Sequence, residues 1–213
     1  MRIYAVADIH GKSERFASIA RVVEERRPDV LVVAGDICAR FGPDPARDAD
    51  TLSRLELPVL LLLGNSEPAR FAKVFSDSPR ISVIHLTQKR IAGTTFVGVS
   101  GAFSVPFSTR LALRQDVILE KLSSLLSPGH VLISHAPPFG ACDKVMGRFS
   151  AGCKALADLV HKARPSVAIC GHIHESPGAG MLGSTLVVNC AMGRSSGAII
   201  NLNGKEARAE LLP

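Results

Sequence analysis

Five short aliphatic runs punctuate the chain, and each one ends at a polar residue or a glycine. The runs are Ile3–Ala7, Val30–Ala34, Val59–Leu63, Val131–Ile133 and Val167–Cys170. Because they are rich in Val, Ile and Leu and alternate little with polar residues, they indicate strands buried on both faces of a sheet. Apolar positions at helical spacing predict helices over Glu14–Arg27, Leu111–Leu126 and Lys154–Ala163. Strands that alternate with helices favour an α/β fold.

The C-terminal part of the chain has a different pattern. Three strand-like segments, Thr185–Asn189, Ala198–Leu202 and Glu206–Leu211, follow one another, with Gly and Asn among the residues between them and no helical pattern. This spacing predicts antiparallel strands that complete or extend a sheet. Residues Ile81–Val99 also indicate short strands. Since the sequence has no repeat, low-complexity tract or linker, we expect a single domain over residues 1–213.

Polar side chains follow all five aliphatic runs at the points where the strands end. They are Asp8, His10, Asp36, Asn65, His135, His172 and His174. Ligands of open α/β sheets bind beyond the carboxyl ends of the strands, so these side chains converge if the strands are parallel neighbours. Seven oxygen and nitrogen donors exceed what one tetrahedral zinc ion needs, and none is a thiolate. They suit two divalent ions about 3.5–4 Å apart.

Glycines flank these candidate ligands at Gly11, Gly35, Gly64 and Gly171. Glycine lets the backbone turn sharply and approach a metal ion or a phosphate closely. In the segment His172-Ile173-His174, the two imidazoles lie two positions apart and can face the same site if the backbone is extended.

Five ordered blocks together resemble the calcineurin-like metallophosphoesterase superfamily. The blocks are Asp8-x-His10, Gly35-Asp36, Gly64-Asn65-x-Glu67, His135 and Gly171-His172-x-His174. A lone block would be a weak signal, but five in order after strands are a strong one. The surroundings of His135 and His172 are most similar to the small prokaryotic phosphoesterases.

The resemblance implies an α/β fold arranged as a four-layer α/β/β/α sandwich of two mixed sheets, with a dinuclear metal site at the carboxyl ends of the strands. By position, Asp8, His10, Asp36 and His174 would hold one ion. Asp36, Asn65, His135 and His172 would hold the other. Asp36 would bridge the two ions, and Asp36, Asn65 and His135 are the catalytic candidates. The ions would be two of Mn, Fe, Zn, Ni or Co, because such sites accept several first-row metals.

The activity that the resemblance implies is hydrolysis of phosphodiesters or small phosphomonoesters by a hydroxide activated at the two metals. One position departs from the family pattern: many relatives have a His after the motif Asn that protonates the leaving group, and here Ser66 stands there. A serine hydroxyl is a poor general acid near neutral pH, so we expect better turnover of good leaving groups. Glu67 could hold a ligand imidazole or cap the segment that starts at Pro68, and we favour the structural role.

Two other functions are compatible with these residues. A nuclease of the same superfamily is one, but the chain leaves little room for extra DNA-binding parts and has one Tyr and no Trp for stacking bases. A non-catalytic protein-interaction scaffold is the other, although all seven expected ligands are present. The expected partner is therefore a small phosphate ester, and nucleic acid is possible but not favoured. The sequence does not indicate an oligomeric state.

Charge, apolar runs and cysteine content bear on nucleic-acid binding and on cellular location. The net charge of +6 is ordinary for a small domain, so it indicates a solvated surface rather than nucleic-acid binding. The apolar opening is too short for a signal-peptide core and no aliphatic run is long enough to cross a membrane, so we expect a cytoplasmic protein. Five scattered Cys, none in a C-x-x-C pair, fit a reducing compartment.

No substrate-binding residue is identifiable from the sequence. Specificity would come from three loop-like stretches, Ala39–Asp50, Phe103–Arg110 and Pro138–Gly152. Four arginines in such stretches could grip a phosphate, although a solvated position is expected for each: Arg40, Arg110, Arg148 and Arg194. We expect surface or structural roles for the other histidines and burial for two of the cysteines: His85, His130, His161, Cys38 and Cys170.

Overall fold

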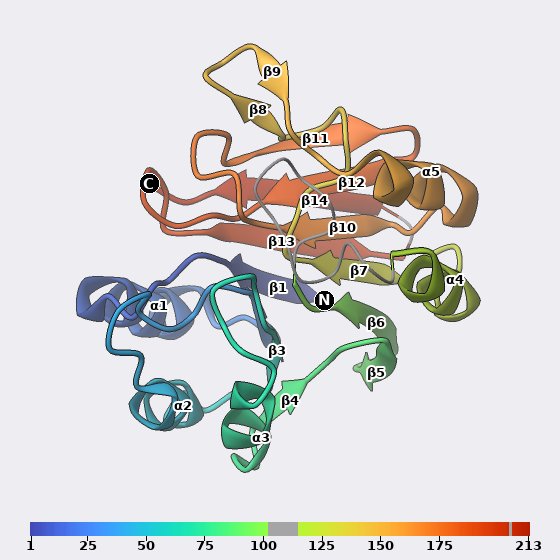
Figure 1. The fold of residues 1–213 in the computed structure, drawn as a ribbon. Coiled ribbons are helices and arrows are strands. Elements are labelled where there is room, and N and C mark those ends of the chain that lie inside the picture. Colours follow the sequence, from blue (N-terminus) through green and yellow to red (C-terminus); the bar gives the residue numbers. More distant parts are fainter. Residues whose placement is uncertain (102–114, 205) are drawn as a thin grey trace.

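The computed structural model describes residues 1–101, 115–204 and 206–213 (Figure 1). Two six-stranded sheets form its centre. The first has the strand order β14-β13-β1-β2-β3-β4 and the second has the order β11-β12-β10-β7-β6-β5. The two sheets pack face to face through aliphatic and aromatic side chains such as Ile3, Val32, Phe96 and Ile169. Burial of both sheet faces explains why the strands read as continuous aliphatic runs.

The first sheet has four parallel strands at its centre and one edge, and two antiparallel strands at the other edge. Its strands are β1 (Arg2–Val6), β2 (Val30–Ala34), β3 (Val59–Leu62), β4 (Ile81–Val83), β13 (Ala198–Asn203) and β14 (Glu206–Leu211). As predicted, the two last strands of the chain are antiparallel and extend this sheet.

The second sheet is parallel in its four central strands and antiparallel at both edges. Its strands are β5 (Thr87–Ile91), β6 (Thr94–Val99), β7 (Val131–Ser134), β10 (Val167–Cys170), β11 (Gly178–Leu182) and β12 (Thr185–Asn189). The antiparallel pairing predicted for residues 185–189 holds on one side only, because β12 pairs antiparallel with β11 but parallel with β10. The reason is β11, which forms a hairpin with β12 and reverses the chain first.

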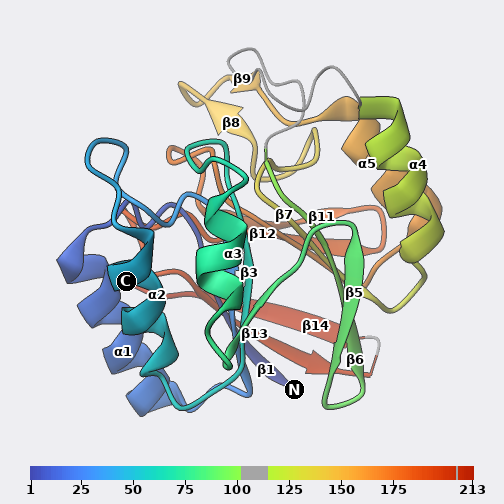
Figure 2. The same ribbon diagram turned by 60° about the horizontal axis from the view of Figure 1, so that its bottom comes forward.

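Helices cover the outer face of each sheet (Figures 1 and 2). The first sheet is covered by α1 (Ser13–Arg26), α2 (Pro45–Ser53) and α3 (Phe71–Ser76), and the second by α4 (Gln115–Leu125) and α5 (Lys154–Ala163). A separate apolar cluster lies between each helical layer and its sheet. The predicted four-layer α/β/β/α sandwich is therefore confirmed.

Two of the three predicted specificity loops contain regular structure. Helix α2 occupies part of the stretch from Ala39 to Asp50, and Asp44 caps it by accepting a hydrogen bond from the Arg47 N–H at 3.0 Å. A small hairpin of β8 (Lys144–Val145) and β9 (Phe149–Ser150) lies in the stretch from Pro138 to Gly152. The third stretch, 103–110, and the start of the helix predicted from Leu111 lie outside the described residues.

All five cysteines are unpaired. Within the described parts of the chain, no helix has the length and apolar character needed to cross a membrane.

Candidate metal centre

The candidate ligands lie where the carboxyl ends of strands from both sheets meet; we call this place the shared edge. They do not lie along one sheet alone. The aliphatic pattern alone brought them together only if the strands were parallel neighbours, whereas the resemblance implied two sheets. In the structure, β1, β2 and β3 belong to the first sheet, and β7 and β10 belong to the second. Contacts between Asp8 and His174, and between Asp36 and His135, connect the two sheets at this edge. The site therefore lies between the two sheets, where the carboxyl ends of both sets of strands meet.

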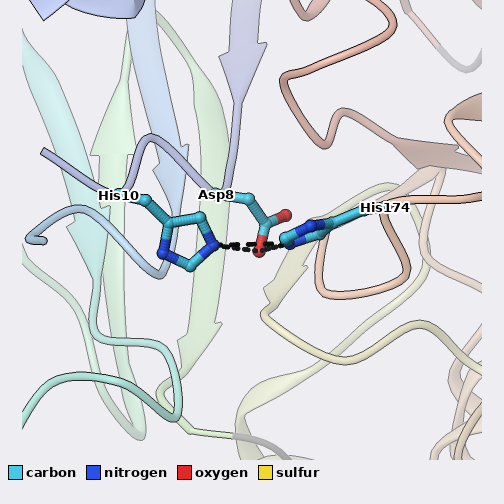
Figure 3. A group of neighbouring side chains, drawn as sticks. All are labelled: Asp8, His10 and His174. Atoms are coloured by element: carbon cyan, nitrogen blue, oxygen red, sulfur yellow. Dashed lines mark hydrogen bonds and ion pairs between the residues drawn. The ribbon is translucent and has the colours of Figure 1, made fainter. Parts of the chain in front are cut away.

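One group of side chains surrounds the carboxylate of Asp8 (Figure 3). His174 Nε2 lies 3.0 Å from Asp8 Oδ1, and His10 Nε2 lies 4.0 Å from the same oxygen. The two imidazole nitrogens lie 3.4 Å from each other. Asp8 is fully buried, His10 is partly buried and the side chain of His174 is half exposed, so this group opens to solvent on the side of His174.

A second group surrounds the fully buried imidazole of His135. Its Nε2 lies 3.4 Å from Asp36 Oδ1 and 3.0 Å from Asn65 Oδ1. His172 Nδ1 lies 3.3 Å from the same nitrogen. His135 Nδ1 lies 2.8 Å from the carbonyl oxygen of Ala34, and donation to that oxygen leaves the Nε2 lone pair aimed at the group.

Asp36 belongs to both groups. Its Oδ1 faces His135, and its Oδ2 lies 3.9 Å from His10 Nε2. The structure thus brings all seven predicted residues together, and ligand atoms of Asp8, Asp36 and His135 also lie within 4.8 Å of one another.

The backbone of the site is held in unusual conformations. Asp8, His10, Asp36 and His172 all have left-handed backbone angles, with φ between 53° and 68°. Such conformations are uncommon outside glycine and concentrate at functional sites. These residues lie in the loops that follow β1, β2 and β10.

Two flanking glycines are required by close packing against the ligands. A Cβ atom on Gly64 would lie 1.9 Å from Asp36 Oδ1, and a Cβ on Gly35 would lie 2.6 Å from His135 Nδ1. These distances are far below van der Waals contact, so no larger residue fits at either position while the ligands keep their places.

The donor set fits a divalent cation. Asp8 Oδ1 is buried and receives no hydrogen bond from the described residues, and its close neighbours are His174 Nε2 at 3.0 Å and His10 Nε2 at 4.0 Å. A buried carboxylate oxygen without a donor is costly unless a cation compensates it. Imidazole nitrogens, carboxylates and one amide oxygen, with no thiolate, suit first-row divalent metals.

Electrostatics favour ligation by His172 and His10, whereas the contact with Asp8 raises the pKa of His174. Burial, together with neighbouring His135, lowers the pKa of His172 to about 4, so its imidazole is neutral at physiological pH. Burial likewise lowers the pKa of His10. For His135, burial opposes protonation, but the carboxylates of Asp36 and Asp8 outweigh it and raise the pKa. A cation would displace any such proton, because a metal ligand must be unprotonated.

Glu67 connects the loops that follow β2 and β3. Its buried carboxylate accepts hydrogen bonds from the backbone N–H groups of Asp36 (3.1 Å), Cys38 (3.1 Å) and Gly64 (2.8 Å). Burial and the charge of Asp36 raise the pKa of Glu67 to about 7. The favoured role, a cap for the segment that starts at Pro68, was wrong, because Glu67 binds the amides of the two loops and helix α3 begins only at Phe71.

Two further residues support the site and were not identified from the sequence. The Arg15 guanidinium donates to the backbone carbonyl of Asp8. Asn189 is fully buried and donates to the carbonyls of Cys142 (3.1 Å) and Ile173 (3.0 Å), which fixes the segment between His172 and His174. A polar residue at the end of a buried strand was a usable signal for Asn189, whereas no signal distinguished Arg15 from other helical arginines.

The remaining predicted side chains lie where a structural or surface role was expected. His85 and His130 accept backbone hydrogen bonds through Nδ1, and His161 is exposed. Cys38 and Cys170 are buried. Arg40, Arg148 and Arg194 are exposed, and Arg110 lies outside the described residues.

Comparison with known sequences connects this site to one protein family. Residues 1–176 match the family model of the calcineurin-like phosphoesterases. The chain is 29% identical to "Uncharacterized protein MJ1162" of Methanocaldococcus jannaschii over 202 residues, which cover 89% of this chain and 87% of that protein. It is 25% identical to "UPF0046 protein T07D4.2" of Caenorhabditis elegans, covering 77% of this chain and 50% of the worm protein.

Solved structures share the fold. The crystal structure of TT1561 of Thermus thermophilus superposes with a TM-score of 0.74 at 17% identity and covers 99% of this chain and 98% of its own. An archaeal phosphodiesterase superposes with a TM-score of 0.58 at 14% identity and covers 100% of both chains. The family match spans most of the chain and all seven candidate ligands. The chain belongs to the calcineurin-like phosphoesterases, and it is a hydrolase that acts on phosphoric esters.

Proposed function

We propose that the protein hydrolyses phosphodiesters or small phosphomonoesters with two divalent ions held by the seven candidate ligands. The observation that carries this proposal is the position of Asp36. One of its oxygens faces His135 and the other faces His10, so a single carboxylate serves two separate sets of donors. The ions would be two of Mn, Fe, Zn, Ni or Co.

Bound ions would activate the attacking water and offset the charge that grows on the phosphoryl oxygens. The number of carboxylates among the ligands sets the net charge of the site. Only two of the seven ligands, Asp8 and Asp36, are carboxylates, and Asn65 is neutral. Two divalent cations with two carboxylates keep a net charge of about +2, which attracts an anionic ester. The half-exposed His174 marks the side on which the site opens to solvent.

Ser66 bears on the choice of substrate. Its hydroxyl donates to Asp36 Oδ2 at 2.6 Å, so its proton is already engaged and its acidity is low. The chain therefore offers no acid at this position for protonating a departing alkoxide. This supports substrates with good leaving groups, which depart without protonation.

The proposed activity is tested with bis(p-nitrophenyl) phosphate. Metal-free protein is supplied separately with Mn, Fe, Co, Ni and Zn, and release of p-nitrophenol is followed. We expect turnover with at least one metal and background rates for Asp36→Ala. Asp50→Ala is the matched control, because Asp50 lies on the exposed face of α2 and its side chain pairs with Arg54. Absence of turnover with all five metals would contradict the proposal and favour a non-catalytic scaffold.

The leaving-group preference is tested on the same protein with p-nitrophenyl and alkyl phosphodiesters. We expect the alkyl ester to be hydrolysed more slowly, beyond the difference in a nonenzymatic reference reaction. Equal enzymatic rates would show that another group protonates the leaving oxygen.

A further inference from the structure

Ser66 contacts Asp36 twice. Its backbone N–H donates to Asp36 Oδ1 at 3.0 Å, and its hydroxyl donates to Asp36 Oδ2 at 2.6 Å. Each carboxylate oxygen therefore receives one hydrogen bond from the same residue. Two bonds to both oxygens from one partner fix the plane of a carboxylate as well as its position.

Each oxygen of the Asp36 carboxylate keeps one lone pair that can face one of the two groups of ligands. A carboxylate oxygen has two lone pairs, and Ser66 uses one on each oxygen. The other lone pair of Oδ1 is free for the group around His135, whose Nε2 is 3.4 Å away. The other lone pair of Oδ2 is free for the group around His10, whose Nε2 is 3.9 Å away. Rotation of the carboxylate about its own axis would spoil both alignments at once.

The other neighbours of Asp36 do not provide this orientation. Glu67 holds the Asp36 backbone N–H, and Gly64 gives the carboxylate room, but neither donates to its oxygens. Among the described residues, Ser66 alone donates hydrogen bonds to both Asp36 oxygens.

We propose that Ser66 is a positioning residue that holds the Asp36 carboxylate so that each oxygen faces one metal ion. This inference rests on the two-ion site of the proposed function. The residue at this position would then orient a metal ligand, and it would not protonate the leaving group. Partners that hydrogen-bond to a metal ligand typically change metal affinity by about 10- to 100-fold when they are removed.

Direct metal binding tests the proposal without a substrate. Metal-free protein is titrated with Mn²⁺ by calorimetry as wild type, Ser66→Ala and Ser66→Thr, and folding of each is checked by circular dichroism. We expect two ions per chain for the wild type and an affinity about 10- to 100-fold lower for Ser66→Ala. Ser66→Thr keeps the hydroxyl and should stay near the wild type.

Ser100→Ala is the matched control. The Ser100 hydroxyl oxygen accepts a hydrogen bond from Leu63 N–H, so this variant also disturbs the segment after β3, but this bond involves none of the candidate ligands. We expect its Mn²⁺ affinity to match the wild type.

The possible results separate the inference from the function on which it rests. Fewer than two ions on the wild type, both with Mn²⁺ and with the metal that gives the highest turnover, would overturn the two-ion function itself. Two ions on the wild type, with the same affinity in Ser66→Ala, would overturn only the role of Ser66. A loss in Ser66→Thr or Ser100→Ala as large as in Ser66→Ala would also overturn that role, because it would trace the effect to the loop and not to the hydroxyl.

Discussion

Single atoms set the geometry of Asp36, on which the proposed site depends. Glu67 holds its backbone, Ser66 holds both of its oxygens, and the missing side chain of Gly64 leaves the space in which it lies. The proposed site therefore requires a glycine at position 64, because a Cβ there would occupy the space of the Asp36 carboxylate.

Gly64→Ala tests this requirement at the residue scale. The new Cβ would lie 1.9 Å from Asp36 Oδ1, so the carboxylate has to move. We expect a loss of about 1–3 kcal/mol in the free energy of unfolding and weaker Mn²⁺ binding, measured by chemical denaturation and calorimetry. Gly180→Ala is the control, because its Cβ meets only Cys142 Sγ at an ordinary 3.6 Å. Equal behaviour of the two variants would mean that Asp36 is not tightly confined.

The positions of the seven ligands were predictable because each follows an aliphatic run, and the carboxyl ends of strands are where ligands bind. The partners of those ligands were not. Glu67 contacts amides that lie 29 and 31 residues away in the chain, and Arg15 reaches a backbone carbonyl. Many polar side chains can bind a backbone group far away in the chain, so the residue type alone did not identify these two contacts.

Helices and strands were predictable from the sequence where their apolar residues recur at regular spacing. Helix α5 has buried Leu156, Ala157 and Val160 at helical spacing, and its predicted bounds match the structure. The sequence of helix α2 predicts a loop, because it is short and mostly polar and only Ala49 and Leu52 supply buried apolar contacts. The direction of β12 depended on the hairpin with β11, whose glycine-rich sequence carries little strand signal.

Leu156→Ala tests the contribution of α5 to the layer over the second sheet. Leu156 is fully buried in the cluster between this sheet and its helices. Truncation leaves a cavity, and we expect a loss of about 2–5 kcal/mol in the free energy of unfolding, measured by urea denaturation. Val117→Ala on α4 is the control, since Val117 is 65% exposed and should change stability by less than about 0.5 kcal/mol. A similar small effect for Leu156→Ala would mean that α5 adds little to this layer.

At the scale of the whole molecule, the site exists because two sheets end at the same edge. Each sheet supplies part of the donor set: Asp8, His10, Asp36 and Asn65 follow strands of the first sheet, and His135, His172 and His174 follow strands of the second. Neither sheet alone would hold both proposed ions. The aliphatic pattern predicted the strands, but their division between two sheets followed only from the family resemblance, because the same buried runs also fit one wide sheet.

The stoichiometry of activation by metal tests the two-ion claim most directly. Metal-free protein is titrated with the metal that gives the highest turnover of bis(p-nitrophenyl) phosphate, and the rate is plotted against tightly bound ions per chain. We expect the rate to reach its maximum at two ions per chain and to stay near background at low occupancy. A maximum at one ion per chain, or turnover without metal, would contradict the two-ion site.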